Sequence, residues 1–208
     1  MKLSTPLAAF GLVLAVGTAQ SAPVLSFLID GNTFTQPFSI SNSSTGGEFV
    51  TRFQLDLTPV SMIFDTATGG PPGNGTIGVP FTPVGGDAAL TGLVAGPGPV
   101  DGASLLDIAF TGFDPGETFR WDIDVDGASG SPITVTGDML IGALATIDFS
   151  DGQRLLGVLS AVAGDPDASQ FVVTGITVTP SVPLPGTMAL AGLALAALVV
   201  VRRGKQRG

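Results

Sequence analysis

The sequence contains no cysteine, no histidine and no tyrosine. Without cysteine, the chain has no disulfide framework, thiolate zinc site or cysteine nucleophile. Without histidine, it has no Ser-His dyad, no HExxH metal site and no charge switch near neutral pH. The two lysines, Lys2 and Lys205, lie at the extreme ends of the chain, which argues against a Schiff-base mechanism. These absences exclude most catalytic classes, and we expect a protein that is not an enzyme.

Charged residues are also scarce, at 12 % of 208 residues, and their two signs are segregated. All seventeen acidic residues lie between Asp30 and Asp167, where only three arginines accompany them, so this region carries a net charge of −14. Such an acidic surface repels phosphate backbones, and we therefore expect no nucleic-acid partner. The length predicts one domain with appended terminal segments.

The N-terminal segment 1–21 has the pattern of a secretory signal peptide. A single cation, Lys2, precedes an apolar run at 7–16, which is followed by small residues up to Ala22. Cleavage after Ser21 places Ala19 and Ser21 at the two positions where signal peptidase requires small side chains. Ten apolar residues are too few to span about 30 Å of hydrocarbon. We therefore expect a signal-peptide helix, recognised by the export translocon and signal peptidase, and a mature chain that begins near Ala22.

The C-terminal segment 182–208 has the pattern of a membrane anchor. No charged residue occurs from Val182 to Val201, and a basic tail at 202–208 follows. We expect a transmembrane helix at 186–201, because about 20 residues including its upstream flank suffice to cross a bilayer. Basic residues after such a segment act as a stop-transfer signal and stay in the cytoplasm, which places the preceding domain outside. The stop-transfer residues are Arg202, Arg203, Lys205 and Arg207.

A short proline-containing motif precedes this apolar segment, in the order Val182, Pro183, Leu184, Pro185. Motif, small-residue apolar helix and terminal arginine cluster together resemble the PEP-CTERM class of bacterial sorting signals, in its VPLPA variant. The chain departs from that variant at Gly186, where alanine is usual. The resemblance implies recognition by an exosortase-type enzyme that removes the helix and basic tail. It also implies a bacterium that makes extracellular polysaccharide, and a protein first anchored in the inner membrane and then located at the cell surface or outside the cell.

Between residues 22 and 181 the hydrophobic pattern has a period of two, which is typical of antiparallel strands with one buried face. In 49–57, one face carries Phe49, Thr51, Phe53, Leu55 and Leu57, and the other carries Val50, Arg52, Gln54 and Asp56. In 118–126, Phe119, Trp121, Ile123 and Val125 alternate with charged residues. Further strands are expected at 24–29, 33–39, 60–65, 88–94, 104–111, 133–136, 139–149, 153–160 and 170–179, separated by Gly, Pro and Asp turns. We predict an all-β domain, an antiparallel β-sandwich of jelly-roll type.

The segment DIDVDG, residues 122–127, begins like an EF-hand calcium loop. Position 12 of that loop would be Ile133 instead of a glutamate, and no helical pattern flanks it, so we reject an EF-hand. Two interpretations of Asp122, Asp124 and Asp126 stay open. They are the solvated face of a strand, or they bind Ca²⁺, the one cofactor that the sequence suggests.

We therefore expect a non-enzymatic exported protein, anchored at the membrane or cell surface, that associates with extracellular polysaccharide. One alternative is a calcium-dependent carbohydrate-binding module that uses the aspartates. A second alternative is a glycoside hydrolase that uses a pair of carboxylates.

Overall fold

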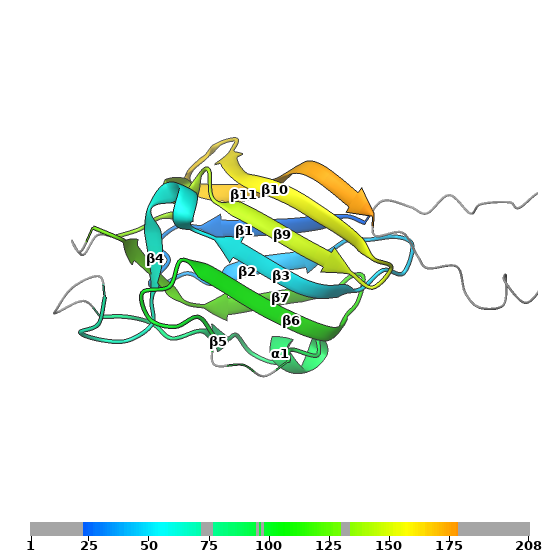
Figure 1. The fold of residues 1–208 in the computed structure, drawn as a ribbon, viewed down its shortest axis with the longest axis horizontal. Coiled ribbons are helices and arrows are strands. Elements are labelled where there is room, and N and C mark those ends of the chain that lie inside the picture. The colour runs from blue at the N-terminus through cyan, green and yellow to red at the C-terminus, as the bar shows by residue number, and fades with distance from the viewer. Residues whose placement is uncertain (1–22, 72–76, 95, 97, 130–133, 179–208) are drawn as a thin grey trace, which may run out of the picture.

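The computed structural model describes residues 23–71, 77–94, 96, 98–129 and 134–178. Within them, nine strands form one antiparallel sheet in the order β5-β7-β2-β1-β11-β10-β9-β3-β6, and β4 pairs with β8 separately (Figure 1). Helical turns are short. The elements are β1 (Leu25–Asp30), β2 (Phe38–Asn42), β3 (Val50–Asp56), η1 (Thr58–Val60), β4 (Met62–Asp65), β5 (Thr82–Pro83), α1 (Asp87–Leu90), β6 (Leu105–Phe113), β7 (Thr118–Asp122), β8 (Asp124–Gly127), η2 (Gly137–Leu140), β9 (Leu144–Phe149), β10 (Gln153–Val162) and β11 (Asp165–Val178).

The nine-stranded sheet curls back on itself, so that its two halves face each other across one core. β1 and β3 are separated by three strands in the sheet, yet the rings of Phe27 and Phe53 lie 4.9 Å apart. β6 and β7 belong to opposite halves, yet Phe110 and Phe119 lie 5.1 Å apart. The all-β prediction is confirmed, whereas the sandwich of jelly-roll type is not, because the described sheet is continuous. The helices predicted at 1–21 and 186–201 lie outside the described residues.

Trp121 on β7 is the centre of this core and is fully buried. Its ring stacks on Phe27 at 6.0 Å, on Phe38 at 5.5 Å and on Phe119 at 5.4 Å. Phe53 contacts it from the facing half of the sheet at 5.7 Å. Offset aromatic pairs at these separations add to the free energy gained from apolar burial, so this cluster joins the two halves of the sheet.

The predicted strand 49–57 exists as β3, but its first residues face the other way. A β-bulge between Val50 and Arg52 shifts the register with both neighbouring strands. Val50 is therefore buried, while Phe49 and Thr51 are only half-buried. Beyond the bulge, Phe53 and its alternate neighbours face the core as predicted. A bulge adds one residue to one strand, so the side chains before it point to the opposite face of the sheet. A period-two pattern in the sequence does not reveal this change.

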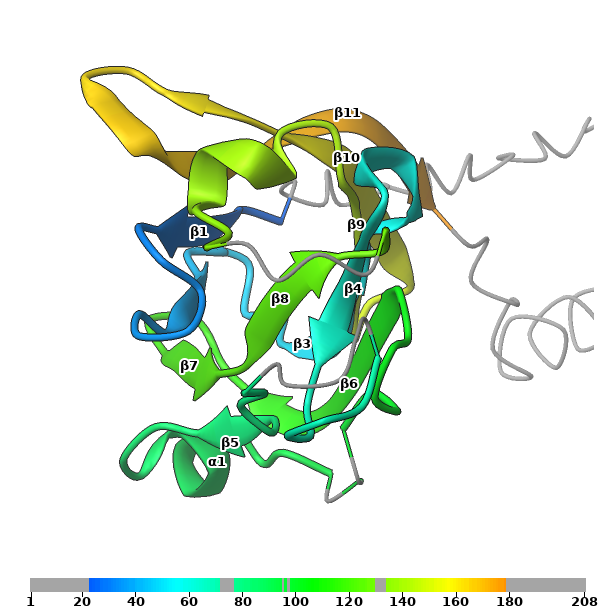
Figure 2. The same ribbon diagram turned by 90° about the vertical axis from the view of Figure 1, so that its left-hand side faces the viewer.

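Five other predicted strands are wrong in whole or in part. Segment 33–39 is a turn before β2 begins at Phe38, and the described part of 133–136 holds only a single bridge at Thr136. Segment 88–94 contains the end of α1 and a single bridge at Leu93, and 139–149 begins in η2 before β9. Segment 118–126 is split at Ile123 into β7 and β8. After the split, β8 leaves the main sheet and pairs with β4, and Figure 2 shows this pair lying across one end of the curled sheet.

Among the helices that the structure describes, none is long and apolar enough to cross a membrane.

We predict that Gly157→Ala destabilises the domain. Gly157 lies at a bulge in β10, and a Cβ there would stand 2.2 Å from the Phe171 ring and 2.4 Å from the Val172 carbonyl oxygen. Overpacking of this kind costs about 1–3 kcal/mol of unfolding free energy, measurable by urea denaturation. The matched control is Gly112→Ala in β6, where a Cβ meets no atom within 4 Å. Equal stabilities of the two variants would contradict the packing at β10.

Candidate metal centre

Three carboxylates gather where β4 and β8 pair. Asp65 ends β4 and stands directly opposite Asp124, the first residue of β8, in the antiparallel register. Asp126 lies two residues further along β8, and alternate residues of a strand share a face. One carboxylate oxygen from each of the three lies within 4.8 Å of the others. We call these three residues the aspartate trio.

The aspartate trio is buried, which is unusual for carboxylates. Asp65, Asp124 and Asp126 are 0 %, 7 % and 5 % exposed. Burial disfavours a charged carboxylate. Burial, together with the negative charges of Asp126 and Asp65, raises the pKa of Asp124 to about 6, although hydrogen bonds from Val125 and Thr33 favour the ionised form.

The surroundings hold these side chains in place. The Asp124 Oδ1 atom accepts hydrogen bonds from the Val125 amide at 2.9 Å and from the Thr33 hydroxyl at 3.4 Å. Val79 bridges the two strands, because its amide donates to the Asp65 carbonyl and its carbonyl accepts from the Asp124 amide. Gly78 packs against Asp65, since a Cβ there would lie 2.4 Å from its Oδ1 atom.

The three arginines of the described residues pair with other carboxylates on the outside of the sheet. Arg52 binds Asp107, Arg120 binds Asp87, and Arg154 binds Asp148. These pairs raise the pKa of each arginine and lower that of Asp107, chiefly through the side-chain hydrogen bonds between the partners. Each arginine among the described residues therefore lies in one of these three ion pairs.

The structure brings together two of the three aspartates that the sequence singles out. Asp124 and Asp126 are buried, so the interpretation as a solvated strand face is wrong for both. Asp122 ends β7, is half-buried and is not part of the trio. Sequence reasoning missed Asp65. It placed Asp65 at the end of a strand, but no local pattern shows that this strand pairs with residues 124–127.

The geometry suits a hard divalent cation. Ca²⁺ binds oxygen at about 2.3–2.6 Å, so two ligand atoms on one ion lie at most about 5 Å apart, and the trio is within this limit. Carboxylates and carbonyls are the ligands that Ca²⁺ prefers. Without a cation, the same burial favours proton uptake. The trio can thus hold a cation or share protons.

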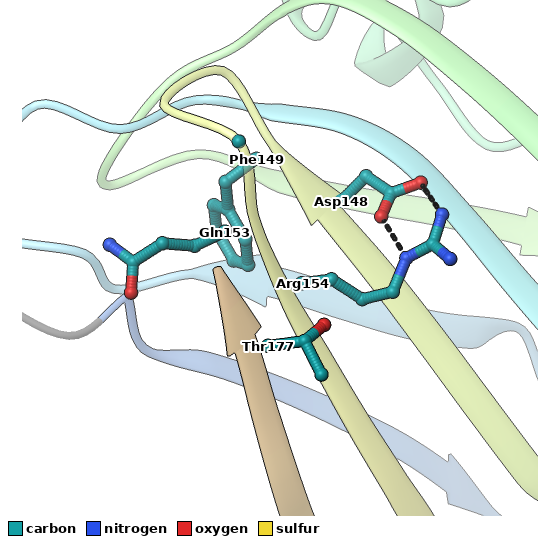
Figure 3. Close-up of a pocket in the computed structure, with 6 residues that line it drawn as sticks. Asp148, Phe149, Gln153, Arg154 and Thr177 are labelled. Carbon is teal, nitrogen blue, oxygen red and sulfur yellow. Dashed lines mark hydrogen bonds and ion pairs between the residues drawn. The ribbon is translucent and has the colours of Figure 1, made fainter. Parts of the chain in front are cut away.

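A second, shallow pocket of about 330 Å³ lies where β10 begins (Figure 3). Arg154 and Asp148 face each other there in a bidentate pair, with the Arg154 Nη2 atom 2.8 Å from Asp148, and Thr177 of β11 lies beside them. Because the arginine is already neutralised, the pocket offers hydrogen-bonding groups instead of a free charge. Phe149, Gly152 and Gln153 complete its lining.

Comparison with known proteins bears on the C-terminal segment. Residues 181–203 match the PEP-CTERM protein-sorting motif. The chain carries a PEP-CTERM sorting signal. The matched range includes Val182 to Pro185 as well as Arg202 and Arg203, which confirms the resemblance seen in the sequence. It lies outside the described residues.

PEP-CTERM signals are recognised by exosortase, and they mark exported, surface-associated proteins that are anchored in a membrane before processing. No curated protein and no solved structure matches the chain.

We predict that calcium raises the melting temperature of the full-length chain in detergent. Binding to the folded state alone stabilises it by about 2.7 kcal/mol at a hundredfold excess over Kd, which corresponds to about 5–10 °C. Asp65→Asn should abolish most of this shift, because it removes one carboxylate of the trio. Asp122→Asn is the matched control and should keep the shift. Identical melts of the parent chain in millimolar calcium and in chelator would contradict calcium binding.

We also predict that, in chelator, the pKa of Asp124 makes the domain less stable as pH rises from 4 to 7. The folded-state pKa of about 6 exceeds the ordinary value of 3.8, so the stabilisation is present below pH 4 and is lost as pH passes 6. The loss amounts to about 1–3 kcal/mol of unfolding free energy. Urea denaturation at several pH values should show it. Asp124→Asn should flatten the profile, and an unchanged profile in that variant would refute the assignment.

Proposed function

We propose that this protein is a non-enzymatic component of an extracellular polysaccharide matrix. Its chain is exported with loss of residues 1–21, is held in the inner membrane by residues 182–208, and is then released from that anchor by an exosortase-type enzyme. The single observation that carries the proposal is the PEP-CTERM motif at 181–203. The association with polysaccharide rests on the kind of bacterium in which such signals occur.

The aspartate trio does not fit the glycoside-hydrolase alternative. Glycoside hydrolases place two carboxyl groups on either side of an open cleft, so that a sugar ring fits between them. The trio is the tightest acidic cluster among the described residues, and its members are at most 7 % exposed. A sugar cannot reach carboxylates buried to this extent without unfolding the β4–β8 pair. The glycoside-hydrolase alternative therefore lacks an accessible pair at this position.

A calcium-dependent carbohydrate-binding module is the second candidate, and the aspartate trio is the observation that favours it. A cation at this depth would not touch a sugar directly. It would instead fix β8 against β4 and so hold the surrounding loops in one conformation. In this case retention on polysaccharide would require calcium, and Asp65→Asn would weaken retention even in its presence.

The proposal is tested by intact-mass measurement and fractionation of the protein from its native cell. We predict a mature chain that begins near Ala22 and ends between Val182 and Gly186, found at the cell surface or in the medium. A strain without the exosortase should retain the complete tail in the inner-membrane fraction. Recovery of the complete tail from cells with an intact processing system would contradict the proposal and leave a plain single-pass anchor.

A further inference from the structure

The β-domain begins and ends on the same side. β1 starts at Leu25, beside Asn42, and β11 ends at Val178, beside Gln153 of β10. Both strand ends lie on the right of Figure 1. The turn 150–152, between β9 and β10, is on this side as well, since the Ser150 amide donates to the Phe49 carbonyl. We call this side, which comprises Val24, the connection 43–49, the turn 150–152 and residues 176–178, the tether end.

The aspartate trio lies at the opposite end of the sheet. β7 runs from Thr118, which pairs with Ser41 at the tether end, to Asp122, and the trio residues of β8 follow directly. The turn between β10 and β11, around Ala163, is also at this distal end. Six residue steps of about 3.3 Å from Thr118 to Asp124 place the trio about 20 Å from the tether end. β10 has ten residues and separates the turns at its two ends by about 30 Å.

Very little chain separates the tether end from the sorting signal. Strand β11 ends at Val178 and the PEP-CTERM motif begins at residue 181, so only residues 179 and 180 intervene. The four residue steps from Val178 to residue 182 reach at most about 14 Å. The uncharged stretch from Val182 to Val201 has twenty residues, about the number that a helix needs to cross the hydrocarbon core. Because all of it is needed, the bilayer boundary lies close to residue 182.

We propose that the unprocessed protein stands on the membrane with its tether end at the lipid headgroups and the aspartate trio at the far end, about 20 Å outward. The inference rests on the proposed anchoring by the PEP-CTERM tail. The headgroup layer is about 5–8 Å deep on each side, so a tether of at most about 14 Å keeps the end of β11 within about 9 Å of this layer.

The side chains at the tether end indicate that the short covalent connection, and not charge attraction, holds this end close to the lipid headgroups. Val24 and Ile176 expose 51 % and 49 % of their surface there. Asp151 is on the same side and would be repelled by anionic lipids. The covalent connection must therefore provide the proximity, and the orientation should be lost when the connection is lengthened.

The absence of cysteine allows single probes at the two ends of β10. Ser150→Cys places a thiol in the exposed turn at the tether end, and Ala163→Cys places one in the exposed turn at the distal end. The full chain is reconstituted into vesicles of phosphatidylcholine and phosphatidylglycerol and treated with a membrane-impermeant 5-kDa polyethylene-glycol maleimide. We expect the Ser150→Cys thiol to react at least about tenfold more slowly than the Ala163→Cys thiol.

Two controls make the result decisive. A twenty-residue Gly/Ser insertion after Val178, with a mean span of about 25 Å, should bring the two rates within about twofold of each other. Flotation with the vesicles measures anchoring separately. Equal rates in a chain that floats would overturn the orientation but not the anchoring. A chain that does not float would overturn the proposed function and the orientation with it.

Discussion

The stacking of Trp121 against phenylalanine rings from both halves of the sheet is the interaction on which the rest of this structure depends. A nine-stranded antiparallel sheet with one apolar face must bury that face, and with no helix longer than four residues among the described elements it can do so only against itself. The rings of Phe27, Phe38, Phe53 and Phe119 around Trp121 supply the area that makes the curl favourable.

The aspartate trio is a direct consequence of that closure. Trp121 fixes β7 in the main sheet, and the break at Ile123 turns the chain across the distal end, where β8 meets β4. Ile123 and Val125 are then buried, as the period-two alternation requires. Asp124, which lies between them, and Asp126, which follows Val125, are buried as well. Burial of three like charges is unfavourable unless protons or a cation reduce the charge. The trio therefore links the stability of one end of the domain to pH, and we propose that a divalent cation bound there acts in the same way.

The sequence predicts the class of fold and most of the core, because period-two alternation survives in nearly every long strand. Phe119, Trp121, Ile123 and Val125 all face inward, as predicted. The failures have physical causes. The bulge at Val50 inverts a face without changing composition, and the segment 88–94 is apolar enough for a strand but forms α1 in its place. Two of the three site residues were predictable, because Asp124 and Asp126 stand out in the local DIDVDG sequence. Asp65 joins them only through the pairing of β4 with β8, which are distant in the sequence.

The sorting signal was predictable for the opposite reason, since its three parts are adjacent in sequence and need no tertiary contact.

The central physical claim, that folding buries the trio, is tested most directly by ¹³C NMR titration of the aspartate carboxyl groups. In chelator, we expect Asp124 to titrate with a pKa of about 6, and we expect saturating calcium to abolish this titration near neutral pH. An Asp124 carboxyl that titrates near its ordinary value of 3.8 in chelator would show that the trio is solvated and would contradict its burial.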